Sequence, residues 1–246
     1  MSDLRNCGYF HRDDQLQKRH PVDLLEHALR KSGLESLFSE SLLVLPEAFN
    51  IVGEYYRLCA PDAEVQRRLA ALSARLGLCF VVGFVRDDAD RYSEAVLIDG
   101  GKVLEVLSLK TLWDGSPCYA PFKGPAQDRI VLHRNLRIGG LVCMDATEGQ
   151  AKDVEMQRER HDETVRKLSQ YAEATLLCVP GRFRGPSPDY VAKEWNRRKT
   201  SIIIGNCGIA LTHPSVLHFA NGQTCSAPTD GDCYVHLAPL PLPKAS

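Results

Sequence analysis

Three chemically able side chains each stand at the end of an apolar, strand-like run of the sequence. Glu47 ends the run Leu42-Leu43-Val44-Leu45-Pro46-Glu47, and Lys110 ends the run that begins at Val103. Cys143 closes Ile138-Gly139-Gly140-Leu141-Val142-Cys143. In a layered α/β protein, side chains at strand ends gather at one rim of the sheet. A thiol, a carboxylate and an ammonium brought together there supply a nucleophile, a base and a cation for a developing oxyanion, which is the case for an enzyme.

Each of these residues also has a purely structural interpretation. A cysteine in an apolar strand usually packs as a small hydrophobe, and a glutamate or lysine at a strand end is usually solvated. His133 invites a Cys–His protease interpretation, but nothing around Cys143 is similar to the local protease signatures. The combination therefore carries the argument, and no single residue does.

The nine cysteines predict neither disulfides nor a metal site. No two are separated by the CxxC interval of zinc and redox motifs, and their number is odd. Cys225, Cys233 and His236 stand near one another, but their spacing is irregular for zinc. We expect mostly reduced thiols and no metal.

The composition is ordinary for a soluble globular protein, with 44% hydrophobic and 25% charged residues in a chain of 246. Lys+Arg (30) and Asp+Glu (31) nearly cancel, so the charge gives no argument for a nucleic acid or an acidic membrane as partner. No apolar run approaches the roughly 18 residues that span a bilayer, and the N-terminus has no apolar stretch of the signal-peptide type. We expect one α/β domain over 1–246, with no nucleic-acid or membrane partner and a cytoplasmic location.

Apolar periodicity predicts alternating helices and strands. Helical spacing covers 22–38, 62–76 and a charged stretch at 150–172, whose apolar side would carry Val154, Val165, Leu168 and Tyr171. Strand-like runs cover 42–45, 79–85, 94–98, 103–109, 130–132, 137–143, 174–179, 201–204, 216–219, 224–225 and 233–237. Proline and glycine residues predict a loop at 111–128. The pattern indicates α/β layers with mixed strand pairing.

Three separated segments resemble motifs of the nitrilase (carbon–nitrogen hydrolase) superfamily. The segments around Glu47 and Cys143 resemble its glutamate motif and its nucleophile elbow, and Lys110 takes the place of its lysine after a glycine-containing hairpin. They read Leu45-Pro46-Glu47-Ala48-Phe49, Ser108-Leu109-Lys110 and Gly140-Leu141-Val142-Cys143-Met144-Asp145. Pro180, Trp195 and Gly205-Asn206-Cys207-Gly208 add matches in the same order, and the likeness covers about residues 22–240. Any one motif is weak, but three in order are fairly specific.

The resemblance implies a fold, a reaction and a partner. The fold is an α-β-β-α sandwich with two mixed β-sheets, which commonly pairs into homodimers through its helices; the charged helix at 150–172 is the candidate contact. The reaction is hydrolysis of a small amide, nitrile or carbamoyl compound without a cofactor. Glu47 would take the thiol proton, Cys143 would attack the carbon, and Lys110 with the backbone N–H of Met144 would stabilise the anion. Water activated by Glu47 would then release the acid from a thioester.

Further expectations concern the residues around this trio. Asn206 is expected in the pocket wall, Trp195 in packing, and Asp145 in shaping the elbow rather than in proton transfer. The loops at 111–128 and 182–195 should set the substrate. Within the second loop, the residues available for an acidic or polar substrate group are Arg182, Arg184 and Tyr190.

Two departures separate the chain from the family pattern. The family's second glutamate, which helps to position the lysine and the substrate, is missing: Cys118 stands about where it would fall, and Asp114 is the nearest carboxylate. Family members also open with a strand, but residues 1–20 offer only the weak candidate Asn6–Phe10, so we expect a weakly defined N-terminal segment with the first strand missing or altered. The alternative to a hydrolase is therefore a catalytically impaired protein of this fold that serves in binding or assembly.

Overall fold

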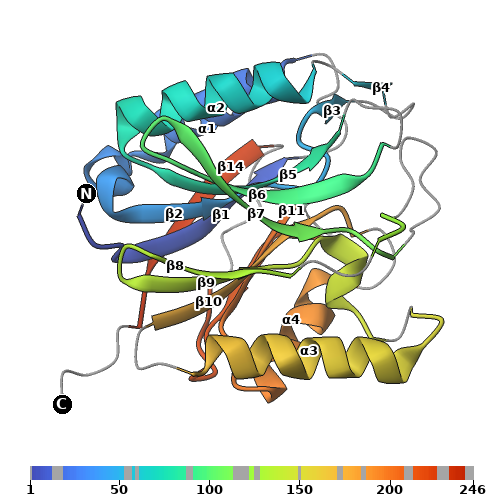
Figure 1. The fold of residues 1–246 in the computed structure, drawn as a ribbon. Coiled ribbons are helices and arrows are strands. Elements are labelled where there is room, and N and C mark those ends of the chain that lie inside the picture. Colours follow the sequence, from blue (N-terminus) through green and yellow to red (C-terminus); the bar gives the residue numbers. More distant parts are fainter. Residues whose placement is uncertain are drawn as a thin grey trace.

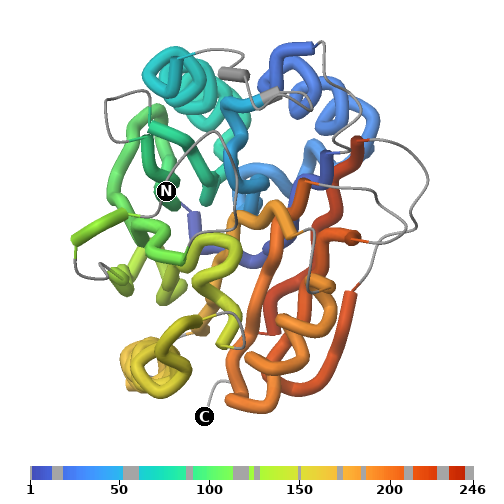
Figure 2. Tube along the Cα trace, turned by 90° about the vertical axis from the view of Figure 1, so that its right-hand side faces the viewer, coloured from blue at the N-terminus to red at the C-terminus, as the bar shows by residue number. Residues whose placement is uncertain are grey.

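The computed structural model contains two six-stranded β-sheets that lie between two layers of helices (Figure 1). It describes residues 2–12, 19–52, 57–58, 61–86, 91–112, 122–124, 128–148, 151–170, 174–183, 187–207, 213–225 and 233–241. Figure 2 shows the same layers from the side, with the blue and cyan helices at the top and the yellow and orange helices at the bottom. The expected α-β-β-α sandwich with two mixed sheets is confirmed.

The first sheet has the strand order β14-β1-β2-β5-β6-β7. Its members are β1 (Asn6–Arg12), β2 (Ser41–Val44), β5 (Cys79–Val85), β6 (Ser93–Asp99), β7 (Lys102–Leu109) and β14 (Cys233–Pro239). Strands β1, β2 and β5 are parallel neighbours. Strand β14 pairs antiparallel with β1, β6 with β5, and β7 with β6. Its outer face is covered by α1 (Pro21–Ser32) and α2 (Asp62–Leu76), with the short 3-10 helix η1 (Glu35–Glu40) beside them.

The second sheet has the order β13-β12-β11-β10-β9-β8. Its members are β8 (Ile130–His133), β9 (Leu136–Gly140), β10 (Ala174–Gly181), β11 (Ile202–Asn206), β12 (Val216–His218) and β13 (Thr224–Cys225). Strands β9, β10 and β11 are parallel. Helices α3 (Val154–Leu168) and α4 (Pro188–Arg197) cover its outer face (Figure 1). A two-stranded ribbon of β3 (Ile51–Val52) and β4 (Arg57–Leu58) stands apart from both sheets.

Strand β5 shows why its sequence is apolar throughout. Phe80, Val82 and Phe84 point to the layer between the first sheet and α1 and α2, whereas Cys79 and Val81 join the core between the two sheets. A strand covered on both faces has no polar side, so the alternation of a half-exposed strand disappears. None of the helices in the described part of the chain is long and apolar enough to cross a membrane.

The first strand is present at the weak candidate Asn6–Phe10, so the expected alternative in which it is missing was wrong. Residues Asn6–Arg12 form β1, which is buried throughout and lies between β2 and β14. The polar residues of β1 make its sequence unlike that of a buried strand. Arg12 donates to the carbonyls of Phe49 (3.2 Å) and Ile51 (3.0 Å), and His11 Nδ1 lies 3.1 Å from Ser215 Oγ. Polar side chains can occupy a buried strand because these bonds satisfy them.

Candidate active site

Glu47 follows β2 in a tight turn and is fully buried. Its backbone N–H donates to the carbonyl of Gly181 at the end of β10 (3.2 Å), which ties the turn to the second sheet. Gly83 of β5 makes room for the turn, because a Cβ there would lie 2.6 Å from Glu47 Cα and 2.8 Å from Pro180 Cβ. The carboxylate is thus placed where the two sheets meet.

Lys110 directly follows β7 and is also fully buried. Its Nζ donates to Glu47 Oε1 at 3.0 Å, which forms an ion pair without solvent exposure on either side. Its backbone is fixed on both sides, since its N–H donates to Ser93 and its carbonyl accepts from Phe122 N–H. Buried charges occur in proteins almost only when they are paired, so Glu47 and Lys110 depend on each other.

Cys143 begins the short 3-10 helix η2 (Cys143–Ala146), three residues after β9 ends. The expected strand over 137–143 is therefore too long. Cys143 has a φ of +46°, a left-handed conformation that non-glycine residues rarely adopt. Such strain persists only where the surroundings impose it, and it concentrates at functional sites. The thiol is 1% exposed, and its Sγ accepts from the backbone N–H of Arg182 at 3.4 Å.

Hydrogen bonds to the end of β10 connect the three candidate residues. Glu47 N–H bonds the Gly181 carbonyl, and the next residue, Arg182, donates its N–H to Cys143 Sγ. Lys110 contacts Glu47 directly. The Glu47–Lys110 pair and the Cys143 thiol are therefore linked to successive residues, Gly181 and Arg182, at the end of β10.

Asp145 holds the elbow to the lysine segment. Its carboxylate accepts from the backbone N–H groups of Thr111 (2.8 Å) and Leu112 (2.7 Å), and from Arg160 Nη2 (3.2 Å). Burial raises the pKa of the Asp145 carboxyl, and Arg160 opposes that rise. These bonds join η2 to the residues that follow Lys110; that Asp145 shapes the elbow stays a prediction.

The other expected site residues have different surroundings. Asn206 Oδ1 accepts from Phe183 N–H (2.8 Å) and its Nδ2 donates to the His213 carbonyl (2.7 Å), so its side chain braces the segment after β10. Arg182 is buried beside Cys143 through its backbone, and Met144 is half-buried on η2. Asp114, Cys118 and Arg184 lie outside the described residues.

The segment expected as a pocket loop at 182–195 is helix α4 from Pro188 onward. Tyr190 on this helix is 60% exposed and lines a cavity of about 310 Å³ between α3 and α4. Trp195, also on its wall, is fully buried and donates to the Ala146 carbonyl at 2.9 Å, which agrees with the packing role expected for it. Among the residues that the structure describes, this lining includes neither Glu47 nor Cys143, so the cavity belongs to the outer helical layer.

Helix α3 contributes residues that the sequence pattern did not reveal. Its inner face carries Gln157, Arg160, His161 and Thr164, of which all but the partly buried Arg160 are buried, whereas Val154 is exposed. The expected apolar side is confirmed in part: Leu168 is buried and Val165 packs against the core, whereas Val154 is exposed and Tyr171 lies outside the described residues. Gln157 Nε2 lies 2.6 Å and His161 Nε2 2.8 Å from the Asp145 carbonyl. In the sequence these polar residues recur at helical spacing within a charged stretch, a pattern that usually indicates a solvent-exposed face.

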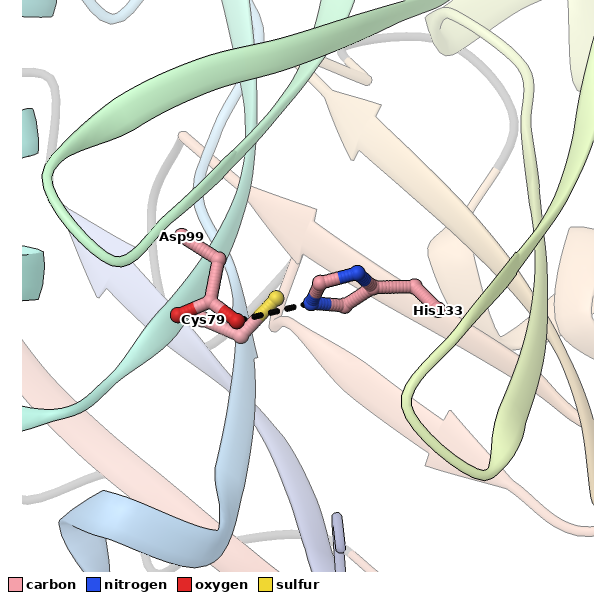
Figure 3. A group of neighbouring side chains, drawn as sticks. All are labelled: Cys79, Asp99 and His133. Carbon is pink, nitrogen blue, oxygen red and sulfur yellow. Dashed lines mark hydrogen bonds and ion pairs between the residues drawn. The ribbon is translucent and has the colours of Figure 1, made fainter. Parts of the chain in front are cut away.

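A second polar group lies at the opposite end of the strands. Cys79 Sγ, an Asp99 oxygen and a His133 nitrogen all lie within 4.8 Å of one another (Figure 3). Asp99 accepts from His133 Nε2 (2.7 Å), from Arg134 Nε and Nη2 (both 2.9 Å) and from Gly100 N–H (2.7 Å). Burial raises the pKa of the Asp99 carboxyl, but these partners outweigh burial and lower it.

This donor set does not fit a metal. The oxygens of Asp99 are already bonded, Arg134 supplies the positive charge, and burial raises the pKa of the Cys79 thiol far above its ordinary value. Arg134 also donates to the carbonyls of Ser39 (3.0 Å) and Ser2 (3.3 Å), so the group joins several elements. His133 thus has a structural partner in Asp99. The seven cysteines within the described residues are unbridged.

Comparisons with known proteins find solved structures that have the same fold as this chain. No family model and no curated protein matches the sequence. Structures of the amidase from Nesterenkonia sp. AN1 do match. A variant that shows Michael addition of acrylamide at the active-site cysteine is 17% identical, with a TM-score of 0.68 over 97% of this chain and 93% of that chain. Another variant, described as an amidase from the nitrilase superfamily, is 17% identical, with a TM-score of 0.67 over 98% and 92%.

A third structure, a variant in complex with butyramide, is 18% identical, with a TM-score of 0.66 over 96% of this chain and 91% of that chain. The match spans nearly the whole of both chains in each case, and the two mixed sheets with their covering helices agree with it. This chain has the fold of the nitrilase-superfamily amidases.

Proposed function

We propose that this protein is a hydrolase that cleaves a non-peptide carbon–nitrogen bond in a small molecule, through a thioester on Cys143. The observation that carries the proposal is the buried Glu47–Lys110 ion pair, which is linked through Gly181 and Arg182 to a strained and buried cysteine. An amide is the favoured substrate class, because the amidase of the same fold is described with acrylamide, butyramide and fluoroacetamide. Nitriles and carbamoyl compounds are the other substrates that this chemistry admits.

Each residue would have one role in the reaction. Glu47 takes the thiol proton, and the Cys143 thiolate attacks the substrate carbon. Lys110, which already lies 3.0 Å from Glu47, and the Met144 N–H stabilise the oxyanion. The C–N bond breaks as Glu47 returns its proton to the leaving nitrogen. Water, deprotonated by Glu47, then attacks the thioester and releases the acid and the free thiol.

A role in assembly alone is less well supported. Removing two charges from water costs several kcal/mol, and replacing a buried pair by apolar residues often leaves stability unchanged or higher. A protein that serves only as a scaffold has no use for a fully buried carboxylate and ammonium. A reaction that needs both charges explains why the pair is present. We further propose a homodimer, with α3 and α4 as the contact, since Met156 and Tyr190 expose 63% and 60% of their surface there.

The proposal is tested by measuring ammonia release from a panel of small amides, nitriles and carbamoyl compounds, with Cys143→Ala as the blank. A second measurement compares the rate at which iodoacetamide labels Cys143 with the rates at the other thiols, in the wild type and in Glu47→Gln. We expect hydrolysis of at least one amide, and fast labelling of Cys143 that depends on Glu47. No hydrolysis above the blank, together with equal labelling of all accessible thiols, would exclude an activated nucleophile.

A further inference from the structure

Arg160 of α3 lies at the centre of a bonded network between the nucleophile elbow and the lysine segment. Its side chain is largely buried and contacts two carboxylates and one hydroxyl. Nη2 donates to Asp145 (3.2 Å) and Asp128 (2.8 Å), Nε also donates to Asp128, and Nη1 donates to Thr111 Oγ1 (2.9 Å). A guanidinium can do this because its donors are fixed in one plane, which a lysine cannot reproduce.

The network forms hydrogen bonds with residues on both sides of Lys110. On the C-terminal side, Thr111 donates its N–H and its hydroxyl to Asp145, and Arg160 donates to the same hydroxyl. On the N-terminal side, Ser108 Oγ donates to Asp128 Oδ1 at 2.8 Å, and Asp128 is held by Arg160. Arg160 is therefore bonded directly to the side chain one residue after Lys110 and, through Asp128, to the side chain two residues before it.

Arg160 also affects which carboxylate, Asp145 or Glu47, attracts the ammonium of Lys110 more strongly. Asp145 is fully buried, and both Arg160 and Lys110 stabilise its carboxylate electrostatically, Arg160 more strongly. Without Arg160, the ammonium of Lys110 would be drawn towards Asp145 and away from Glu47. A small displacement of this kind matters, because about 1 Å at a reacting centre can cost roughly 10²-fold in rate.

We propose that Arg160 is a positioning residue that holds the Lys110 ammonium where it stabilises the oxyanion formed at Cys143. This inference rests on the proposed function. Arg160 acts through Lys110 and does not itself touch the substrate. Its removal should therefore slow the steps that create an oxyanion and spare the steps that do not.

Two reagents separate these steps at the same thiol. Acylation of Cys143 by p-nitrophenyl acetate passes through a tetrahedral oxyanion: the S–C bond forms, the C–O bond breaks, and p-nitrophenolate leaves. Alkylation by iodoacetamide displaces iodide directly and creates no oxyanion. The ratio of the two rates, measured on the Cys143 peptide by mass spectrometry, reports the oxyanion stabilisation and needs no knowledge of the natural substrate.

The variants are Arg160→Met, Arg160→Lys and the control Arg166→Met, which removes an exposed arginine from the same helix. Arg160→Met should lower the acylation-to-alkylation ratio by about 10²-fold, as expected for loss of an oxyanion donor. Arg160→Lys keeps the charge and should recover about tenfold of that loss, which leaves its ratio about tenfold below the wild type, and Arg166→Met should match the wild type. For any amide that the wild type hydrolyses, kcat should fall with the ratio while KM changes less than about threefold.

An unchanged ratio in Arg160→Met would overturn the inference, as would equal losses of acylation and alkylation, which indicate a distorted elbow. If Arg160→Met does not unfold cooperatively, the test compares Arg160→Lys with the control Arg166→Lys. An acylation-to-alkylation ratio in Arg160→Lys within about twofold of that control would then refute the inference. The two proposals fail separately. If the wild type hydrolyses no amide but its acylation-to-alkylation ratio depends on Arg160, the proposed function fails and the positioning role stands. If the wild type is active but its ratio does not depend on Arg160, the positioning role fails and the proposed function stands.

Discussion

Replacing Lys110 by methionine should strongly destabilise the fold, because it leaves the Glu47 carboxylate buried without its partner. The charges are 3.0 Å apart and both side chains are fully buried. At an effective dielectric constant of about 20, this separation corresponds to roughly 5–6 kcal/mol of attraction. Breaking a buried pair by removing one member costs about 3–5 kcal/mol. We therefore expect Lys110→Met to lower the free energy of unfolding by about 3–5 kcal/mol at neutral pH.

The second substitution in the same pair makes the prediction specific. Glu47→Gln removes the buried charge that Lys110 no longer balances, so the double variant Glu47→Gln/Lys110→Met should be about 2–3 kcal/mol more stable than Lys110→Met alone. The matched control is Lys193→Met, which breaks an exposed pair of 2.6 Å with Asp189 on α4. Exposed pairs within a helix contribute about 0.3–0.5 kcal/mol, so the control should remain close to the wild type.

Urea unfolding followed by circular dichroism measures all four proteins, and equal m-values show that the same surface unfolds in each. A loss of less than about 1 kcal/mol in Lys110→Met would refute the reasoning, because it would mean that water reaches the pair. A double variant less stable than Lys110→Met would also refute it, since the penalty would then come from packing and not from charge.

Three further predictions follow from other features. Gly83→Ala should lower stability by about 1–3 kcal/mol and reduce the labelling of Cys143, since its Cβ would lie 2.6 Å from Glu47 Cα; unchanged thermal unfolding would contradict this. Burial lowers the pKa of His161, so the unfolded chain binds its proton first as the pH falls below the ordinary value of 6.5. Stability should therefore decline below about pH 6.5, and urea unfolding should show a shallower decline in His161→Gln; an identical slope would argue against a buried neutral ring. Met156→Glu should convert the proposed homodimer to a monomer in light scattering, and a wild type that is already monomeric would exclude the α3 contact.

Much of the fold could be predicted because its apolar periodicity was plain. Helix α2 occupies the predicted range 62–76, and the hairpin of β6 and β7 extends the predicted strands by only one or two residues. Glu47 and Lys110 were predicted to meet because each follows an apolar strand, and their contact is the buried ion pair.

The failures occurred where tertiary contacts override local pattern. Strand β1 was only a weak candidate, because its Arg12 and His11 look exposed until their partners are known. The elbow was read as a strand end, although Cys143 turns into a left-handed conformation that no spacing rule announces. Arg160 looked like one more charge on a solvated helix, and only the fold reveals the carboxylates that surround it.

The polar group around Asp99 and Arg134 has a consequence for how this scaffold can change. Arg134 in the β8–β9 turn reaches Asp99 at the end of β6 and the carbonyls of Ser2 and Ser39, so it fastens the two sheets to each other and to the chain around them. Glu47 and Cys143 stand at the other end, where β2 and β9 finish. Because the fastening is remote from Glu47 and Cys143, substitutions around these two residues can change their surroundings without parting the sheets. The residues at this end therefore determine how the sheets are held together, independently of the chemistry at the other end.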